Sequence, residues 1–377
     1  MYLPSNDELL NRESEKWAKY GPDVIPMWVA ESDFGTCPSI KERLAKAIEA
    51  ESFGYAPEPT QMRSALANFY TQRYGWSPRA EWIFPATDVI RGVLQGIMYF
   101  TRTDSPVIIP TPAYWPFYSL AKAAGREMYF IQATPEGISL ADVEEQFKRG
   151  AGSIVLCNPY NPLGFTFKRE FMVELAELAE RYDARVITDE IHAPLVLDGE
   201  HVPMASVSET AAKVTITVTA ASKAWNIAGL KCAQIIFTNE NDVRVWENLG
   251  GPARGGVSIL GQIGAAAAYE APFSFLDEQI EYLRGNRDYV LEELPKLIPG
   301  AKPIKNAATY LMWIDLRDTH LAEHPATKIL EQAKVAVEPG EKYGVGADGN
   351  GAGFIRMNLG CSRATLEEAL RRIATVK

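Results

Sequence analysis

The sequence predicts an α/β fold in which a mostly parallel sheet is sandwiched between helices. One observation is that short apolar, β-branched runs alternate with amphipathic stretches through the middle of the chain. Another is that the stretches between the runs, such as Phe171 to Ala179, have the spacing of surface helices. In such a sheet, ligands bind at the carboxyl ends of the strands. The expected strands are residues 107–109, 128–131, 153–156, 185–188, 214–218 and 233–237.

A smaller α+β domain is expected at the end of the chain. A long charged helix is predicted from Phe275 to about Leu297, and Tyr310 to Leu316 has the pattern of a strand. The chain ends in a helix, where Thr365 and Glu368 have the spacing of a capping box. The predicted parts are an N-terminal segment that packs on the small domain (1–40), a large ligand-binding domain (41–274) and the small domain (275–377).

Composition excludes several classes of function. The chain has 377 residues, of which 47% are hydrophobic and 23% charged, as expected of a soluble protein with a sizeable core. Its net charge of −10 argues against nucleic acid and polybasic membrane surfaces as partners. Neither a CxxC pair nor an HExxH pattern occurs, so no metal site is expected. The absence of a signal-like N-terminus and of a long apolar run favours the cytoplasm.

Lys223 is the most informative residue of the chain. It follows the apolar run from Val214 to Val218 and therefore stands at a strand end. Burial lowers the pKa of a lysine, so its amine can be neutral and nucleophilic, as a Schiff base with an aldehyde cofactor requires. A lone lysine in a turn is more often solvated, so the interpretation depends on the residues that accompany it.

Four further clusters carry residues suited to such a site. Asn161 and Tyr114 stand in Pro-rich turns after strands, where local hydrogen bonds and core packing are the simpler explanations. Asp189 ends a buried strand and must be paired there, whereas the neighbouring Glu190 could merely cap a helix. Arg356 interrupts an apolar strand pattern and needs an anionic partner. Together these residues suit pyridoxal phosphate chemistry, which needs a lysine, an acid and an anion-binding site.

The chain resembles the fold type I pyridoxal phosphate enzymes of the aminotransferase class I/II superfamily, and in particular the bacterial cystathionine β-lyase (C–S lyase) branch. The resemblance covers nearly the whole chain. It implies the pyridoxal phosphate-dependent transferase fold, with a seven-stranded main sheet, and pyridoxal 5′-phosphate as the cofactor. The motifs that carry it are Met27 to Phe34, Phe53-Gly54-Tyr55, Asn158 to Gly164, Asp189 to His192, Ser222 to Gly229, and Arg356-Met357-Asn358.

The resemblance also implies a role for each matching residue around the cofactor ring. Lys223 would form the Schiff base and then move protons. Asp189 would keep the ring nitrogen protonated, and Asn161 would donate to the phenolic oxygen. Tyr114 would stack on the ring and belong to the catalytic group, and His192 would contact the cofactor.

Further implied roles concern the phosphate and the substrate. The phosphate would be bound by Ser222, by Lys231 and by the backbone N–H groups of a helix start at Val89 and Ile90. Tyr55 would reach the phosphate in the neighbouring subunit and act in catalysis there, so a homodimer is implied. The groups that would bind the amino-acid substrate are Arg356, which would clamp its carboxylate, Ala30 and Asn161.

Some residues depart from the pattern of the branch. Residues 30–34 read Ala-Glu-Ser-Asp-Phe instead of Ala-Asp-Met-Asp-Phe. Ala220 stands where relatives often carry a phosphate-binding serine, for which Thr219 or Ser222 could substitute. Asp88 would repel a phosphate, so we expect it to point away or cap the helix. The glycine-rich residues 344–351 lack the P-loop ending and predict a hairpin or mobile loop.

The expected reaction is α,β-elimination from cystathionine or a related S-substituted cysteine, which yields a thiol, pyruvate and ammonia. An aminotransferase would use the same lysine, aspartate and arginine and is the alternative. His192, where transaminases often carry tyrosine, and the stretch from Trp225 to Gly229 favour the lyase. A third possibility is a regulatory protein with this fold, although the intact Lys223, Asp189 and Arg356 speak against a loss of catalysis.

Overall fold

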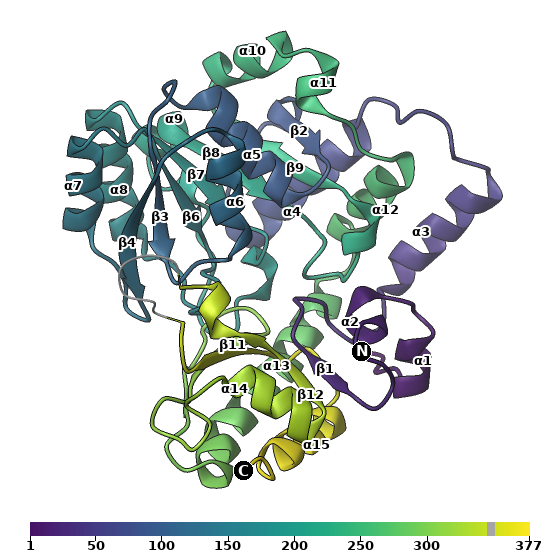
Figure 1. The fold of residues 1–377 in the computed structure, drawn as a ribbon. Helices are drawn as coiled ribbons and strands as arrows, with labels where there is room; N and C mark the ends of the chain where they lie inside the picture. Colours follow the sequence, from purple (N-terminus) through teal and green to yellow (C-terminus); the bar gives the residue numbers. More distant parts are fainter. Residues whose placement is uncertain (345–350) are drawn as a thin grey trace.

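Eight strands form the main sheet in the computed structural model, which describes residues 1–344 and 351–377 (Figure 1). The glycine-rich residues 345–350, where the sequence predicts a hairpin or loop, lie outside the described residues. The strand order is β2-β9-β8-β7-β6-β3-β4-β5. These strands are β2 (Ile83–Ala86), β3 (Val107–Thr111), β4 (Met128–Thr134), β5 (Gly137–Ile138), β6 (Ser153–Cys157), β7 (Arg185–Asp189), β8 (Thr215–Thr219) and β9 (Ala233–Ile236).

The centre of this sheet is parallel, as predicted, from β8 through β7, β6 and β3 to β4. All six strands expected from the sequence are present, and the two-residue β5 adds an antiparallel strand to the predicted seven. The sequence analysis missed β5 and also β2, which contains Pro85 and pairs antiparallel with β9 at the sheet edge. Proline at an edge costs no ladder hydrogen bond, which explains why it is tolerated there.

Helices cover both faces of the main sheet. The helices α5 (Val89–Phe100) and α6 (Pro116–Ala123) contact each other on one face. The helices α7 (Leu140–Lys148) and α8 (Arg169–Arg181) contact each other on the opposite face. A separate helical layer of α3 (Pro38–Glu49), α4 (Thr60–Tyr74) and α12 (Ile259–Tyr269) encloses a second apolar core (Figure 1). Three further α-helices of this part of the chain are α9 (Glu209–Val214), α10 (Glu240–Asn248) and α11 (Gly251–Arg254).

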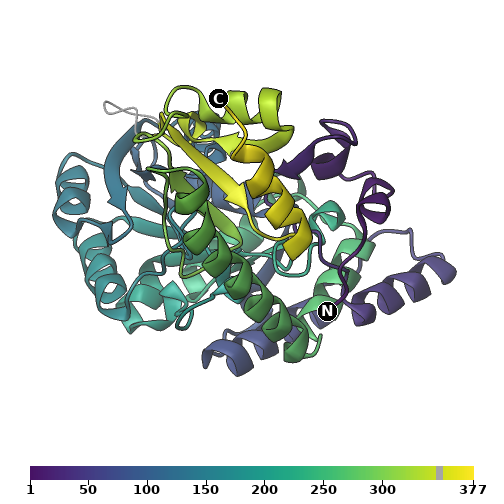
Figure 2. The ribbon, with the colours of Figure 1, turned by 90° about the horizontal axis from the view of Figure 1, so that it is seen from below.

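A second sheet, of order β1-β12-β13-β11-β10, joins the two ends of the chain. Its first strand comes from the N-terminal segment, where β1 (Ile25–Met27) runs parallel to β12 (Val335–Pro339). The other strands are β10 (Lys302–Pro303), β11 (Leu311–Asp315) and β13 (Phe354–Asn358). The long helix α13 (Phe273–Leu297) and the C-terminal helix α15 (Arg363–Ile373) lie side by side against this sheet (Figure 2). The predicted strand and long helix are therefore present, while the domain boundaries at 40 and 274 stay predictions.

The start of α15 differs from the prediction. Its N-cap is Ser362, whose hydroxyl accepts a hydrogen bond from the backbone N–H of Thr365 at 3.1 Å. The proposed capping box of Thr365 and Glu368 is therefore wrong, because the helix begins one turn earlier. Glu368 instead pairs with Arg371 and Arg372 along the helix surface.

The short helices α1 (Asn6–Leu10) and α2 (Glu15–Ala18) precede β1, and α14 (Pro325–Lys328) precedes β12. A buried ion pair fastens α2 to the segment that follows β1. The ammonium group of Lys16 lies 2.9 Å from Oδ1 of Asp33, and both side chains are at least 95% buried. Trp17 donates its indole N–H to the same oxygen at 2.7 Å. No helix among residues 1–344 and 351–377 combines the length and the apolar character needed to cross a membrane.

We expect Asp33→Ala to lower the free energy of unfolding by about 3 to 5 kcal/mol, because it leaves the Lys16 ammonium buried without a counter-ion. Urea denaturation of wild type and variant at equal cofactor concentration measures the difference. Glu81→Ala, which breaks the exposed Arg79–Glu81 pair, is the control and should change stability little. Equal effects of the two substitutions would contradict the prediction.

Candidate active site

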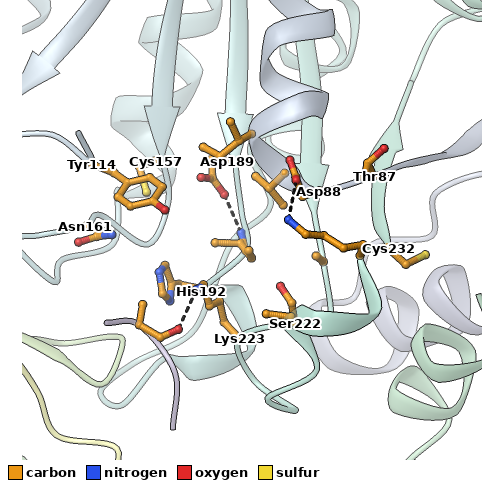
Figure 3. Close-up of a pocket in the computed structure, with 17 residues that line it drawn as sticks. Thr87, Asp88, Tyr114, Cys157, Asn161, Asp189, His192, Ser222, Lys223 and Cys232 are labelled. Atoms are coloured by element: carbon orange, nitrogen blue, oxygen red, sulfur yellow. Dashed lines mark hydrogen bonds and ion pairs between the residues drawn. The ribbon is translucent and has the colours of Figure 1, made fainter. Parts of the chain in front are cut away.

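The carboxyl ends of the central strands surround a cavity of about 200 Å³ (Figure 3). Tyr114 follows β3, Asn161 follows β6, Asp189 ends β7 and Lys223 follows β8. The first turn of α5 closes one side, and Ala30 of the N-terminal segment closes another. The full lining is Ala30, Thr87, Asp88, Val89, Ile90, Tyr114, Cys157, Asn161, Asp189, Ile191, His192, Ala220, Ser222, Lys223, Ala228, Lys231 and Cys232.

Lys223 supplies an amine with a perturbed pKa to this cavity. Its Nζ donates a hydrogen bond to the backbone carbonyl of Ala30 at 2.7 Å. Burial, followed by the nearby positive charge of Arg356, lowers the pKa of Lys223 from 10.5 to about 8, although Asp189 acts in the opposite direction. A large fraction of this amine is therefore neutral near pH 8, so it can act as a nucleophile or a base.

Asp189 is a buried acid with room for a cation. Its side chain points into the cavity, and Oδ1 accepts a hydrogen bond from the backbone N–H of Ile191 at 3.0 Å (Figure 3). Burial raises the pKa of Asp189 from 3.8 to about 7, although the Ile191 N–H and the charge of Lys223 act against it. A protonated nitrogen placed against Asp189 would relieve this desolvation cost.

Arg356 and Asn161 meet beside the cavity. Nη1 of Arg356 donates to Oδ1 of Asn161 at 3.2 Å, and Nη2 donates to the carbonyl of Trp28 at 3.0 Å. The ring of Tyr343 lies 5.1 Å from the guanidinium carbon, and Nε has no hydrogen-bond partner among the described residues. Arg356 is only 3% exposed, so an anion supplied by a ligand is the charge partner that it lacks. It contacts the cavity through Asn161 and is not itself a lining residue.

Two rings line the cavity in their neutral forms. Burial raises the pKa of Tyr114 to about 12, so its phenol keeps its proton. Burial, together with the charges of Lys223 and Arg356, lowers the pKa of His192 to about 3, so its imidazole is uncharged. Nδ1 of His192 has no hydrogen-bond partner among the described residues. A flat ligand ring could therefore contact both side chains without meeting a charge on either of them.

The opposite end of the cavity is formed by the start of α5. Backbone N–H groups at a helix start are free to bind an anion, and Val89 and Ile90 both line the cavity. Oδ1 of Asp88 accepts from the N–H of Arg91 at 2.8 Å, so the predicted helix cap is confirmed. Its Oδ2 lies 3.2 Å from Nζ of Lys231, which therefore has a carboxylate partner in this structure.

The hydroxyl that could replace a serine at position 220 is that of Ser222. Ala220 and Ser222 both line the cavity, while Thr219 does not. The hydroxyl of Thr219 donates to the carbonyl of Glu190 at 3.3 Å, on the buried side of β8. Of the two substitutes considered from the sequence, only Ser222 is in a position to contact a ligand.

Two predicted site residues do not line this cavity: Arg356, which reaches it through Asn161, and Tyr55. The side chain of Tyr55 is fully exposed and lies beside a different groove. The sequence analysis in turn missed Tyr310, whose hydroxyl donates to the carbonyl of Ala30 at 3.1 Å, and Trp28, which accepts from Arg356. Tyr310 lies at the start of a predicted strand, and no local pattern distinguishes it from a core tyrosine.

These residues fit pyridoxal 5′-phosphate. Asp189 has no cation beside it among the described residues, the start of α5 offers N–H donors to a phosphate, and the amine of Lys223 lies in the same cavity. The unpartnered Nδ1 of His192 and the neutral ring of Tyr114 border the space that the ring would fill. Among the described residues, no cluster of three or more His, Cys, Asp or Glu side chains could hold a metal ion.

Residues 22–373 match the protein family described as aminotransferase class I and II. The chain belongs to this family. Its cofactor is pyridoxal 5′-phosphate, and the predicted fold is confirmed. The share of the sequence that matches, more than nine-tenths, includes every site residue described above.

Similar proteins indicate the branch of the family to which the chain is related. The chain is 49% identical to a cystathionine beta-lyase of Corynebacterium glutamicum, with complete coverage of both chains. It is 33% identical to cystathionine beta-lyase PatB of Bacillus subtilis, with 99% of each covered. A crystal structure described as a pyridoxal phosphate-dependent beta-cystathionase from Corynebacterium diphtheriae has a TM-score of 0.97 and 52% identity, over 100% of this chain and 98% of that one. The predicted relationship to the cystathionine β-lyase branch is therefore confirmed.

The reactivity of Lys223 in the cofactor-free protein should rise with pH through about 8. Arg356→Met removes a charge that lowers the pKa of Lys223, so the midpoint should move to higher pH. Asp189→Asn removes a charge that raises this pKa, so the midpoint should move to lower pH. Reductive methylation with formaldehyde, followed by mass spectrometry of the Lys223 peptide, measures each midpoint. Lys302, whose pKa is raised by its hydrogen bond to Asp318, is the internal control. A Lys223 midpoint close to that of Lys302 would contradict the assignment.

Proposed function

We propose that the enzyme catalyses α,β-elimination of cystathionine or a related S-substituted cysteine to a thiol, pyruvate and ammonia. That it is a pyridoxal phosphate-dependent carbon–sulfur lyase follows from its identity to cystathionine beta-lyases and from its structural neighbours. The observation that carries the mechanism is the Lys223 amine, which has a pKa of about 8 and lies inside the cavity. The choice of thioether is the proposed part.

The proposed division of labour assigns one task to each charged group. Arg356 binds the carboxylate of the substrate, since it is a buried guanidinium without an acidic partner among the described residues. Asp189 holds a proton on the ring nitrogen. When bound, pyridoxal phosphate supplies an aldehyde carbon and an electron sink. Tyr114 packs against the ring, and Asn161 lies between the ring and Arg356.

Lys223 then moves the protons. Its neutral amine accepts the α-proton of the substrate, and the bond between Cβ and sulfur breaks as the thiolate leaves. The ammonium form of Lys223 can return a proton to the departing sulfur, because a pKa near 8 lets both forms be populated at neutral pH. Tyr310 holds the Ala30 carbonyl in place while Lys223 is engaged elsewhere.

We include a homodimer in the proposal, in which Tyr55 reaches the phosphate in the partner's cavity. Its complete exposure and its distance from the cavity of its own chain support this. Phe53, two residues before it, is also exposed, as expected of a surface that another copy covers. The domain arrangement of 1–40, 41–274 and 275–377 belongs to the same proposal. A cytoplasmic location is included because all four cysteines are free thiols.

Purified enzyme should release pyruvate and a free thiol from cystathionine without an added keto acid. Pyruvate is followed with lactate dehydrogenase and the thiol with a thiol reagent, over a series that includes S-methylcysteine. Lys223→Ala should lower the rate at least about a thousandfold, since it removes the proton-transfer group and the covalent anchor. A strict requirement for a keto acid would instead establish an aminotransferase.

Mixing two inactive variants tests whether Tyr55 acts across the dimer. If it does, co-expressed Tyr55→Ala and Lys223→Ala chains form mixed dimers with one intact site each. About a quarter of the wild-type activity should return, since half of random dimers are mixed. Each variant expressed alone is the control. No recovery in mixed dimers, verified by differently tagged chains, would show that Tyr55 does not serve the partner's site.

A further inference from the structure

Glu190 follows Asp189 directly, but its side chain lies on the opposite face of β7. Successive strand residues point to opposite faces, so Asp189 faces the cavity while Glu190 enters the core behind it. Glu190 is completely buried and is not a lining residue of the cavity. The sequence suggested a helix cap for Glu190, and the structure instead places the side chain in a polar cluster.

Three donors surround the Glu190 carboxylate. Nε2 of His201 lies 3.0 Å from Oε2, and the backbone N–H of Met204 donates to Oε1 at 2.9 Å. The hydroxyl of Thr188 lies 3.4 Å from Oε1. These donors hold the Glu190 carboxylate immediately behind Asp189, where its negative charge contributes to raising the pKa of Asp189. No step of the proposed reaction uses this charge.

His201 links the cluster to a second cavity. It is 5% exposed, and its ring lies edge-on to Tyr74 with 5.0 Å between the centroids. Its Nδ1 has no hydrogen-bond partner among the described residues, so Nε2 is the ring nitrogen that binds Glu190. His201 and Tyr74 line a cavity of about 590 Å³ that shares no lining residue with the cofactor cavity.

The peptide between Asp189 and Glu190 is fixed from both neighbouring strands. The N–H of Glu190 donates to the carbonyl of Val218 at 2.8 Å, and the carbonyl of Asp189 accepts from the N–H of Asn158 at 2.9 Å. Thr219 donates its hydroxyl to the carbonyl of Glu190. A side chain anchored behind this peptide therefore controls the direction in which Asp189 projects.

We propose that Glu190, held by His201, is a positioning residue that orients Asp189 towards the ring nitrogen of the cofactor and stabilises the proton between them. This rests on the assignment of Asp189 in the proposed function. The charge of Glu190 acts in the required sense, because it adds to burial in raising the pKa of Asp189. The other charged or titratable groups near Asp189 and Glu190 include Lys223, Tyr114, Cys157, Tyr70, Tyr74 and His201.

Glu190→Gln keeps the shape of the side chain and removes its charge. We expect the dissociation constant for pyridoxal phosphate to rise about tenfold. This is the change that corresponds to a shift of about one unit in the pKa of the proton shared by Asp189 and the ring nitrogen. The pH midpoint of the absorbance of the bound cofactor should fall, and kcat should fall more than KM changes. The control is Asp242→Asn, which removes a buried carboxylate that pairs with Arg185 at the other end of β7. It should lower the melting temperature and leave the cofactor's affinity and midpoint unchanged.

A second pair of variants covers the case in which Glu190→Gln does not fold. His201→Gln keeps a donor towards Glu190 and should retain the wild-type midpoint, whereas His201→Leu removes the donor and should reproduce the loss of affinity. Unchanged affinity and midpoint in Glu190→Gln or His201→Leu, with only a lower melting temperature, would overturn the inference. Asp189→Asn distinguishes a failure of the Glu190 inference from a failure of the proposed function. An unchanged midpoint in that variant would refute the role of Asp189 itself.

Discussion

The backbone carbonyl of Ala30 is the point at which the separate parts of the molecule meet. It accepts hydrogen bonds from Lys223, which follows β8 of the main sheet, and from Tyr310, which directly precedes β11 of the second sheet. The flanking carbonyls of Trp28 and Val29 accept from Arg356 and Asn358 of β13. Side chains that follow or belong to both sheets therefore satisfy the backbone of residues 28–30, and Ala30 lines the cavity.

This arrangement explains how a loop can lie at a buried site without an ordered partner strand. Buried carbonyl groups without donors are costly, and a loop in the interior has no ladder to supply them. The backbone carbonyl of Glu31 accepts hydrogen bonds from Lys16 and Asn358. The side-chain amide of Asn226 accepts from the backbone N–H of Ser32 and donates to its carbonyl. When Lys223 breaks its hydrogen bond to the Ala30 carbonyl in order to react, the Tyr310 hydroxyl still donates to that carbonyl.

The parts predicted correctly from the sequence are those whose signal is local. The alternation of runs and helices predicts the parallel sheet, and strand ends then bring Asn161, Asp189 and Lys223 together without any knowledge of distances. Arg356 was found because an arginine in an apolar strand contradicts its surroundings. The resemblance to a family supplied the cofactor and its phosphate-binding residues.

What the sequence did not predict depends on contacts between distant residues. Tyr310 and Ala30 are 280 positions apart. Nothing in the sequence around either residue indicates that Tyr310 and Lys223 both donate to the Ala30 carbonyl. Whether Thr219 or Ser222 faces the cavity is decided by the turn after β8, where Thr219 binds back to Glu190. The cap of α15 was misplaced because Ser362 and Thr365 both suit an N-cap, and only the helix start distinguishes them.

The charges left without partners determine what the cavity binds. Asp189 is buried and protonated more readily than an ordinary aspartate, so its ligand must bring a proton on nitrogen. Arg356 is buried, and its Nε has no hydrogen-bond partner among the described residues, so the guanidinium beside Asn161 can bind an anion. The helix start at Val89 offers a third position, which can bind an anion. Beside it, Asp88 forms an ion pair with Lys231. A ligand with a basic ring nitrogen and a phosphate satisfies the first and third positions, and an amino acid attached to it satisfies the second. Lys223 lies in the same cavity. The burial that lowers its pKa is also what makes an unpaired charge on Asp189 or Arg356 costly.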